Sequence, residues 1–162
     1  MIKLFEQYNE YSQVKEWLDE MGIENYTIND DLTVDVKGNV RIFHQSLTEI
    51  PIQFGVVDGN FYCDYNNLTS LKGCPRYVTK VYNADHNKIN TLKYVPEEIG
   101  WSFSIENNPL PKEIYNFRAF YSISDLLKYQ DEYGIWNSDG SFNKARYDIF
   151  FKDCKSGILE MA

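Results

Sequence analysis

Residues 60–78 read NFYCDYNNLTSLKGCPRYV, and this stretch decides the fold. Apolar residues and turn residues are closely mixed in it, and neither a helical period nor plain strand alternation covers its whole length. The same pattern of residue types returns at an interval of 21 residues along the chain. A fixed period of this size predicts a solenoid, in which each copy of the repeat forms one coil that stacks on the next.

The repeat consists of six columns of similar residues that hold over three or four copies. One column carries side-chain amides, which can turn the chain and hydrogen-bond to backbone groups left unpaired at the bend. Its members are Gln45, Asn66, Asn87 and Asn108. The other five columns are apolar and predict the core: Val40, Phe61, Tyr82, Phe103; Ile42, Cys63, Ala84, Ile105; Leu47, Leu68, Ile89, Leu110; Ile50, Leu71, Leu92; and Val36, Val57, Val78, Ile99.

Residues 36–111 carry this repeat, which resembles the leucine-rich repeat pattern LxxLxLxxNxL. The copy with a GNFYC strand, an NNLTSL turn and a GCP close is similar to short leucine-rich repeat proteins of bacteriophages and prophages. The resemblance implies a small accessory protein made during infection. Such a protein would bind a host protein, for example a defence factor, and inhibit or divert it.

We predict an α+β fold in three parts. Residues 1–35 form a helix and a strand pair that cap the solenoid, residues 36–111 form three to four coils with a parallel sheet, and residues 112–162 form a helical tail. The side chains expected to face the core from the first helix are Phe5, Tyr8, Tyr11 or Ser12, Val14, Leu18 and Met21. Those expected in the strand pair are Tyr26, Ile28, Leu32, Val34 and Val36, with a turn at residues 29–31.

In the tail, helix-capping residues predict two helices. Ser122 or Ser124 is expected to cap a helix over residues 125–133 that ends at Gly134. Asn143 is expected to cap a last helix that runs to about Lys155.

The composition indicates a folded acidic protein, because hydrophobic residues make up 43% of the chain and the net charge is −8. No apolar run approaches the length of about 18 residues that a membrane span needs, and the N-terminus lacks the features of a signal peptide. We therefore expect a cytoplasmic protein, in the infected bacterium if a phage encodes it. A charged partner is expected to be basic, and direct binding of nucleic acid is not expected.

No sequence motif for catalysis, a cofactor or a metal is present. In the stretch around Gly140, the calcium-loop pattern would require acidic ligands at Ile135 and Arg146. His44 and His86 lie two repeats apart, hence about 10 Å apart in a stacked sheet, too far to share a metal. The three cysteines have no zinc spacing and are expected to be free thiols. We expect a protein that is not an enzyme and has no cofactor.

The residues between the core columns are expected to form an exposed partner-binding face. Asp64, Asp85 and Glu106 would form an acidic ladder at strand spacing, where like charges repel. The aromatic side chains beside it are typical of interface anchors. The predicted partner-binding residues are Arg41, Phe43, Tyr62, Asp64, Tyr65, Asp85, His86 and Glu106. The alternatives are a merely solvated acidic face, a bound divalent cation, or aromatics covered by a terminal segment.

The sequence therefore favours a non-catalytic module that binds a host protein with a basic surface. One alternative is an acidic decoy that blocks the nucleic-acid site of a host nuclease or polymerase. Another is a structural, self-assembling component. Salt separates the first two hypotheses, because a decoy should lose affinity steeply as salt is added.

Overall fold

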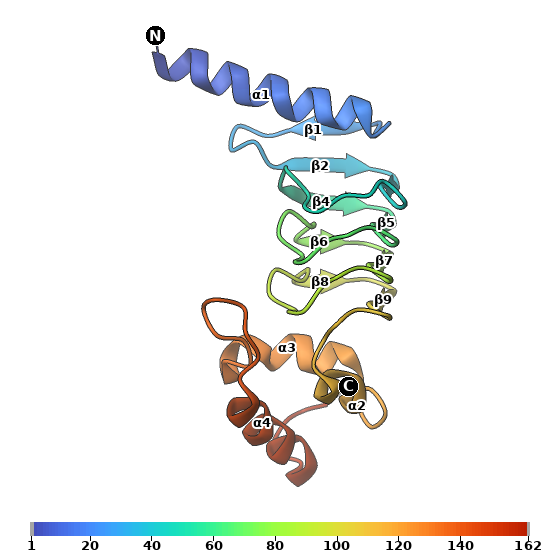
Figure 1. Cartoon of the computed structure of the whole chain (residues 1–162), viewed down its shortest axis with the longest axis vertical. Helices are drawn as coiled ribbons and strands as arrows, with labels where there is room; N and C mark the ends of the chain where they lie inside the picture. The colour runs from blue at the N-terminus through green and yellow to red at the C-terminus, as the bar shows by residue number, and fades with distance from the viewer. Residues whose placement is uncertain (1, 162) are drawn as a thin grey trace.

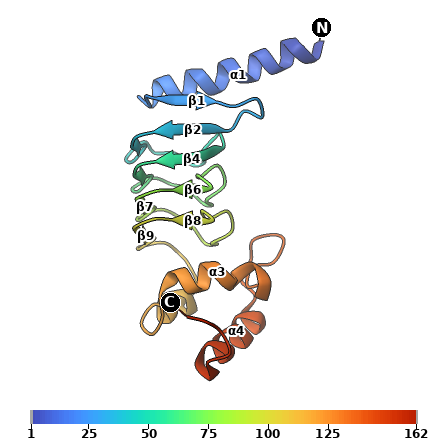
Figure 2. The same ribbon diagram turned by 180° about the vertical axis from the view of Figure 1, so that it is seen from behind.

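The computed structural model describes residues 2–161, and the side chains of residues 6–161. The molecule is an elongated stack with a helix across one end, a solenoid in the middle and a helical bundle at the other end (Figures 1 and 2). The first helix, α1 (Ile2–Glu20), is followed by the coils, and α2 (Lys112–Phe117), α3 (Ile123–Tyr133) and α4 (Lys144–Ser156) complete the chain. The predicted α+β solenoid with helical ends is confirmed.

Two sheets run along the solenoid, which makes about three turns. In sheet order, the first contains β1 (Tyr26–Ile28), β2 (Val34–Lys37), β4 (Phe54–Asp58), β6 (Tyr77–Val78) and β8 (Glu98–Ile99). The second contains β3 (Val40–Arg41), β5 (Phe61–Tyr62), β7 (Val81–Asn83) and β9 (Ser102–Ser104). Strands of successive coils pair in parallel, whereas β1 pairs antiparallel with β2.

The sequence predicted one strand in each coil, and this expectation was incomplete. The opposite side of each coil, expected to be a loop shaped by Gly73 and Pro75, also holds a short strand. The column Val36, Val57, Val78 and Ile99 lies on these strands. At the corner between the two strands of one coil, a Cβ on Gly59 would lie 2.3 Å from the carbonyl oxygen of Gly38. The coils approach each other too closely there for a side chain on Gly59.

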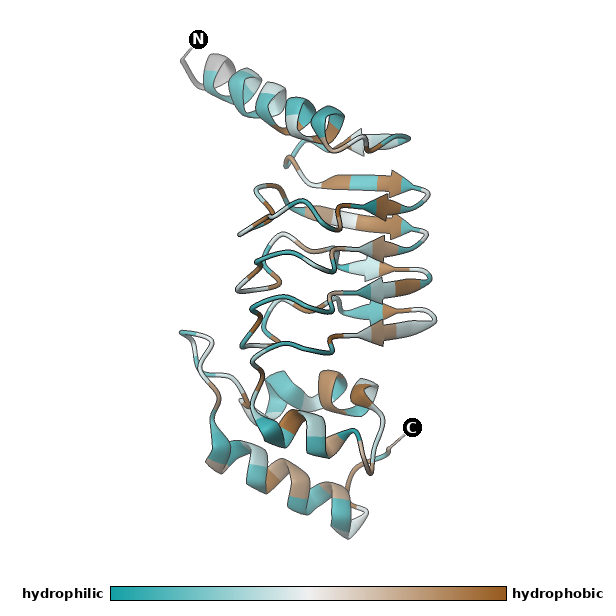
Figure 3. Ribbon diagram, turned by 45° about the vertical axis from the view of Figure 1, so that its right-hand side comes forward, coloured by the Kyte–Doolittle hydropathy of each residue, from teal (hydrophilic) through white to brown (hydrophobic). Residues whose placement is uncertain are grey.

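The core of the solenoid is a stack of aromatic rings at successive coils. The ring of Phe61 contacts Phe54 edge-on at 5.3 Å and stacks on Tyr82 at 5.5 Å, and Tyr82 stacks on Phe103 at 5.4 Å. Phe54, Phe61 and Tyr82 are fully buried, whereas Phe103 in the last coil is half-buried. Apolar and polar positions alternate along the strands, as Figure 3 shows, so one face of each strand points into this core.

Buried asparagines tie the coils together, as predicted. The Oδ1 of Asn66 accepts hydrogen bonds from the backbone N–H groups of Gln45 and Leu47 in the preceding coil, both at 3.0 Å. Its Nδ2 donates to the carbonyl oxygens of Ile42 and Cys63 at 2.8 and 3.0 Å. Asn87 and Asn108 repeat the arrangement one and two coils later, again with Nδ2 donating to two coils. Gln45 does not extend this set, because its amide donates to Phe43 in its own coil.

The N-terminal cap consists of α1 and the hairpin of β1 and β2. Leu18 is fully buried, and Trp17 contacts Phe54 edge-on at 6.3 Å, so the helix covers the first core ring. Gly22 follows α1 with a positive φ of 66°, as expected for a helix stop. Leu32 lies in the hairpin turn with a φ of 65° rather than in a strand, which corrects the prediction. Tyr8 is 70% exposed and does not face the core, which corrects that expectation, and the side chain of Phe5 is outside the described residues.

The C-terminal helices form a second, aromatic core. Ser122 and Asn143 cap α3 and α4, and Gly134 and Gly157 end them in the left-handed conformation, as predicted. The short helix α2 was not predicted, because Pro109 and Pro111 made residues 109–117 look like a simple break in the repeat. The rings that pack together there are Phe117, Tyr121, Tyr147, Phe150 and Phe151.

Candidate functional site

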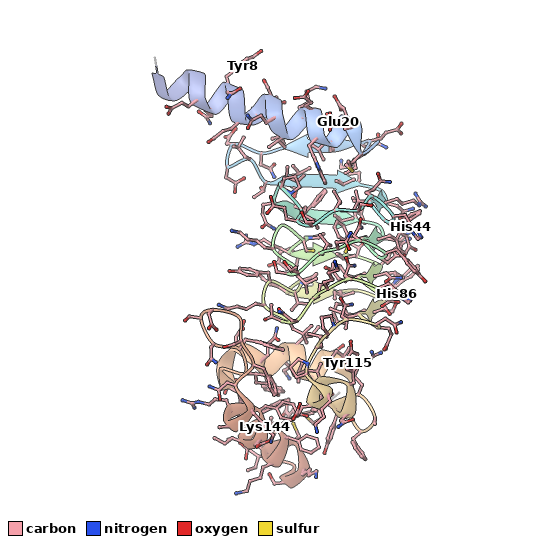
Figure 4. All side chains as sticks on the ribbon, in the orientation of Figure 1. Tyr8, Glu20, His44, His86, Tyr115 and Lys144 are labelled. Atoms are coloured by element: carbon pink, nitrogen blue, oxygen red, sulfur yellow. The ribbon has the colours of Figure 1, made fainter. Side chains whose placement is uncertain are left out.

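One edge of the solenoid carries a row of exposed, mutually stacked rings. The ring of Tyr65 stacks between His44 at 4.5 Å and His86 at 4.3 Å, and Phe43 contacts His44 edge-on at 5.9 Å. We call Phe43, His44, Tyr65 and His86 the aromatic ladder. Figure 4 shows the labelled His44 and His86 on the same edge of the coils. Tyr65 is 47% exposed and Phe43 39%, so neither is covered by the terminal helices.

The backbone conformation of each coil sets the direction of these side chains. His44, Tyr65, His86 and Asn107 all occupy the left-handed region, with φ between 52° and 55° at equivalent positions. The N–H groups of the first three are fixed by the next coil, since those of Tyr65 and His86 donate to the backbone carbonyl oxygens of Asp85 and Glu106 at 3.0 and 2.9 Å. Left-handed backbone costs about 1 kcal/mol for a residue with a bulky side chain. The rings are therefore held in register by an unfavourable but repeated turn.

The side chain of Asn107 continues the row at its C-terminal end. Its Nδ2 lies 3.1 Å from the Nε2 of His86, which extends the contact from ring to amide. The two histidines are separated by the ring of Tyr65, as the repeat spacing predicted. Sequence reasoning missed the stacking, although the three rings occupy a single column of the repeat.

The predicted acidic ladder is not a row of three equivalent free carboxylates, which corrects that expectation. The Oδ1 of Asp85 accepts hydrogen bonds from the Ser104 hydroxyl and the Glu106 N–H, both at 2.6 Å. The carboxylate of Glu106 forms an ion pair with Arg118, just after α2. Of the three carboxylates, that of Asp64 alone makes no hydrogen bond or ion pair with the described residues. The repulsion is thus relieved within the fold at the last two positions.

The remaining predicted site residues lie on the same sheet. Arg41 is exposed and Tyr62 half-buried, and the two are paired neighbours in β3 and β5. Together with Asp64, they flank the aromatic ladder at its first two rings. The structure therefore brings Arg41, Phe43, Tyr62, Asp64, Tyr65 and His86 onto one surface. Asp85 and Glu106 lie beside it with their carboxylates already engaged.

The edge of the last coil is closed by Tyr115 of α2, a residue that the sequence analysis did not identify. Its hydroxyl accepts from the N–H of Asn108 at 3.2 Å and donates to the Asn108 carbonyl oxygen at 2.7 Å, with the Ile105 carbonyl oxygen at 3.3 Å. In earlier coils, the equivalent of the Ile105 carbonyl accepts from the asparagine of the next coil. At the last coil there is no following asparagine, and the hydroxyl of Tyr115 donates to the Ile105 carbonyl oxygen in its place. Burial raises its pKa.

Replacing Tyr115 by phenylalanine is expected to lower the free energy of unfolding by about 1.5 kcal/mol, because backbone groups at the end of the asparagine column lose their partner. Thermal unfolding followed by circular dichroism measures the change. Tyr121→Phe is the matched control, since its hydroxyl makes no hydrogen bond among the residues described. Equal shifts for the two variants would contradict the capping role.

The three cysteines are buried free thiols. Contact with Cys74 and complete burial raise the pKa of Cys63 well above its usual value. The Tyr82 hydroxyl donates to the Sγ of Cys74 at 2.9 Å inside the core, a contact that the expected loop position of Cys74 did not suggest. Burial raises the pKa of Cys154 to about 11. Cys63 and Cys154 are therefore protonated at neutral pH and do not have the lowered pKa of a reactive cysteine.

Among the side chains described, no three or more His, Cys, Asp or Glu residues converge where a metal ion could bind. In the stretch around Gly140, Asp139 accepts from the N–H and hydroxyl of Ser141 at 2.9 and 2.6 Å, which closes a tight turn. Within residues 2–161, no helix has the length and apolar character needed to cross a bilayer.

Comparisons of the chain with models of protein families, with curated proteins and with solved structures gave no match.

Proposed function

We propose that the protein is a non-catalytic binding module of the short leucine-rich repeat type, and that its partner is a host protein with a basic surface. The observation that carries this proposal is the aromatic ladder, exposed beside the free carboxylate of Asp64. In the family that the repeat resembles, the partner would be a bacterial protein that the phage inhibits or diverts. The site of action would be the cytoplasm of the infected cell.

Pre-ordered rings favour binding because little side-chain freedom is lost when a partner docks. Tyr65 is held between two imidazoles, and its backbone is tied to the next coil, so its position is set before binding. Aromatic residues of this kind supply a large contact area in interfaces.

The chemistry of the surface selects for a basic partner. The exposed ring of Phe43 attracts the cationic groups of lysine and arginine, and the carboxylate of Asp64, which precedes Tyr65 in the chain, can pair with the same groups. The net charge of −8 adds a long-range attraction for a basic surface. Aromatic contact and charge therefore act on the same type of side chain.

The test is a pull-down from lysates of candidate bacterial hosts, with captured proteins identified by mass spectrometry. Two double variants, each of which replaces two exposed rings, distinguish binding through the aromatic ladder from nonspecific binding to exposed aromatic residues. The double variant Phe43→Ser/Tyr65→Asn removes two rings and keeps a residue that tolerates the left-handed turn. Its matched control is Tyr8→Asn/Phe120→Ser, which removes two exposed rings elsewhere.

We expect a specific host protein to be captured by the wild type and the control, and to be lost with the ladder variant. Capture should survive moderate salt because aromatic contacts are screened little. Binding that collapses with salt and competes with DNA or RNA would identify the acidic decoy instead. If light scattering of the protein alone shows assemblies larger than a monomer, the protein would instead be a self-assembling component.

A further inference from the structure

A groove of about 500 Å³ lies between the last coil of the solenoid and α3. On the solenoid side it is lined by Glu98, Ile99, Trp101 and Phe103, and on the helix side by Leu127 and Asp131. It is separate from the aromatic ladder, which occupies another edge of the coils. The groove occupies the place where the strands of a further coil would stack, because β8 and β9 are the last strands of their sheets.

The groove leaves part of the core open. Ile99 and Phe103 belong to the same core columns as Val78 and Tyr82, which are 1% and 0% exposed. In the last coil both residues are only half-buried. Trp101 beside them is 71% exposed, with the Lys80 ammonium 5.4 Å from the centre of its ring. The helical cap therefore stops short of the cover that one more coil would give.

Backbone groups in the groove lack a strand partner. The N–H of Gly100 and the carbonyl of Ser104 are bonded to the preceding coil, at 2.9 Å each. Since successive peptide groups along a strand alternate in direction, those of Ile99 and Phe103 point to the open side. No side chain or loop among the residues described accepts from their N–H groups. The two residues lie on different sheets, and an extended backbone laid along β8 would satisfy the peptide groups of Ile99.

The charged side chains that line the groove indicate the charge of the segment that could bind there. The carboxylates of Glu98 and Asp131 make no hydrogen bond or ion pair with described residues. Glu98 lines the groove from the solenoid and Asp131 lines it from α3, and Lys128 is the basic residue that lines it with them. Like charges on the two walls favour an occupant with lysine or arginine. They also disfavour a second copy of this chain, whose net charge is −8.

We propose that the groove is a second binding site, which takes an extended basic segment of a partner protein as an added β-strand. Main-chain hydrogen bonds to Ile99 on the open edge of β8 would give affinity, as in other cases of strand addition to an exposed sheet edge. One side-chain row of the segment would cover Ile99 and Phe103, the half-buried members of the core columns. The other row would place its basic groups between Glu98 and Asp131. This site does not depend on the function proposed for the aromatic ladder.

The test is fluorescence anisotropy with a labelled octapeptide of alternating lysine and valine, titrated with the full chain. The key variant is Glu98→Lys/Asp131→Lys, which reverses the groove charge at two exposed positions without removing a contact. Its matched control is Glu16→Lys/Glu24→Lys, which makes the same change in net charge at exposed positions far from the groove. A second probe carries N-methyl groups on alternate peptide bonds, which blocks main-chain pairing along one edge.

We expect the wild type and the control to bind the lysine–valine peptide, and the groove variant to bind it about tenfold or more weakly. The groove variant should gain affinity for the matching glutamate–valine peptide, and the N-methylated probe should bind poorly. Equal losses in the groove variant and the control would show general charge attraction and overturn the proposal. Unchanged binding of the N-methylated probe, or wild-type self-association that the groove variant abolishes, would also overturn it. The Phe43→Ser/Tyr65→Asn variant should bind the peptide normally, so failure of the ladder proposal stays distinguishable.

Discussion

Replacing Asn87 by alanine is expected to lower the free energy of unfolding by about 4 kcal/mol. The Nδ2 of Asn87 donates to the carbonyl oxygens of Cys63 and Ala84 at 3.0 and 3.2 Å. Its Oδ1 accepts from the N–H of Leu68 at 3.0 Å. These groups lie inside the fold where water cannot replace the amide, so each one left without a partner costs about 1–3 kcal/mol. Chemical denaturation followed by circular dichroism gives the change.

An aspartate at position 87 sharpens this prediction because it has nearly the same size as asparagine. Its carboxylate would face carbonyl oxygens that now receive N–H groups, and burial would raise its pKa above the unfolded value of about 3.9. A raised pKa in the folded state means that stability is lost as the pH rises from that value through the folded pKa. Asn87→Asp should therefore be less stable at pH 7 than at pH 4, relative to the wild type.

The control for both substitutions is Asn90, an exposed asparagine in the loop that follows. Asn90→Ala and Asn90→Asp should each change stability by less than about 0.5 kcal/mol. If Asn87→Ala costs no more than Asn90→Ala, the asparagine column does not hold the coils together.

Replacing Phe61 by alanine should have an effect of similar size, about 4 kcal/mol. The ring of Phe61 is fully buried between Phe54 and Tyr82, with ring centroids 5.3 and 5.5 Å away. Its loss removes apolar burial and leaves a cavity that the stacked strands cannot close without shifting register. Phe120→Ala is the control, because that ring is 74% exposed. Similar denaturation midpoints for the two variants would contradict the stacked aromatic core.

The coils could be predicted from the sequence because each column has one physical role that every copy repeats. An amide at Asn66 must turn the chain wherever the repeat turns, so Asn87 and Asn108 follow at the same interval. The helix ends could be predicted as well. Ser122 caps the start of α3 with its side chain, and Gly157 ends α4 in the left-handed conformation that glycine favours. Local rules and the period together were sufficient for this part of the fold.

In the first sheet, the strands β6 and β8 were missed because each is only two residues long and shows no alternation. The partners of the acidic residues were missed for a different reason. Glu106 pairs with Arg118 through α2, a helix whose existence the two prolines concealed. The capping hydroxyl of Tyr115 depends on the same helix. Contacts made once, between a repeat and a non-repeated segment, leave no periodic trace in a sequence.

The constant offset between coils bears on how such a chain can change length over generations. Val40 pairs with Phe61, and Tyr82 pairs with Phe103, each 21 residues further on. Coils contact only their neighbours, so a duplication or loss of one whole unit would join ends whose register already matches. A gain or loss of a single residue would instead turn the following side chains to the wrong face. Over generations, the gene can therefore gain or lose whole coils while the segments at both ends of the solenoid stay the same.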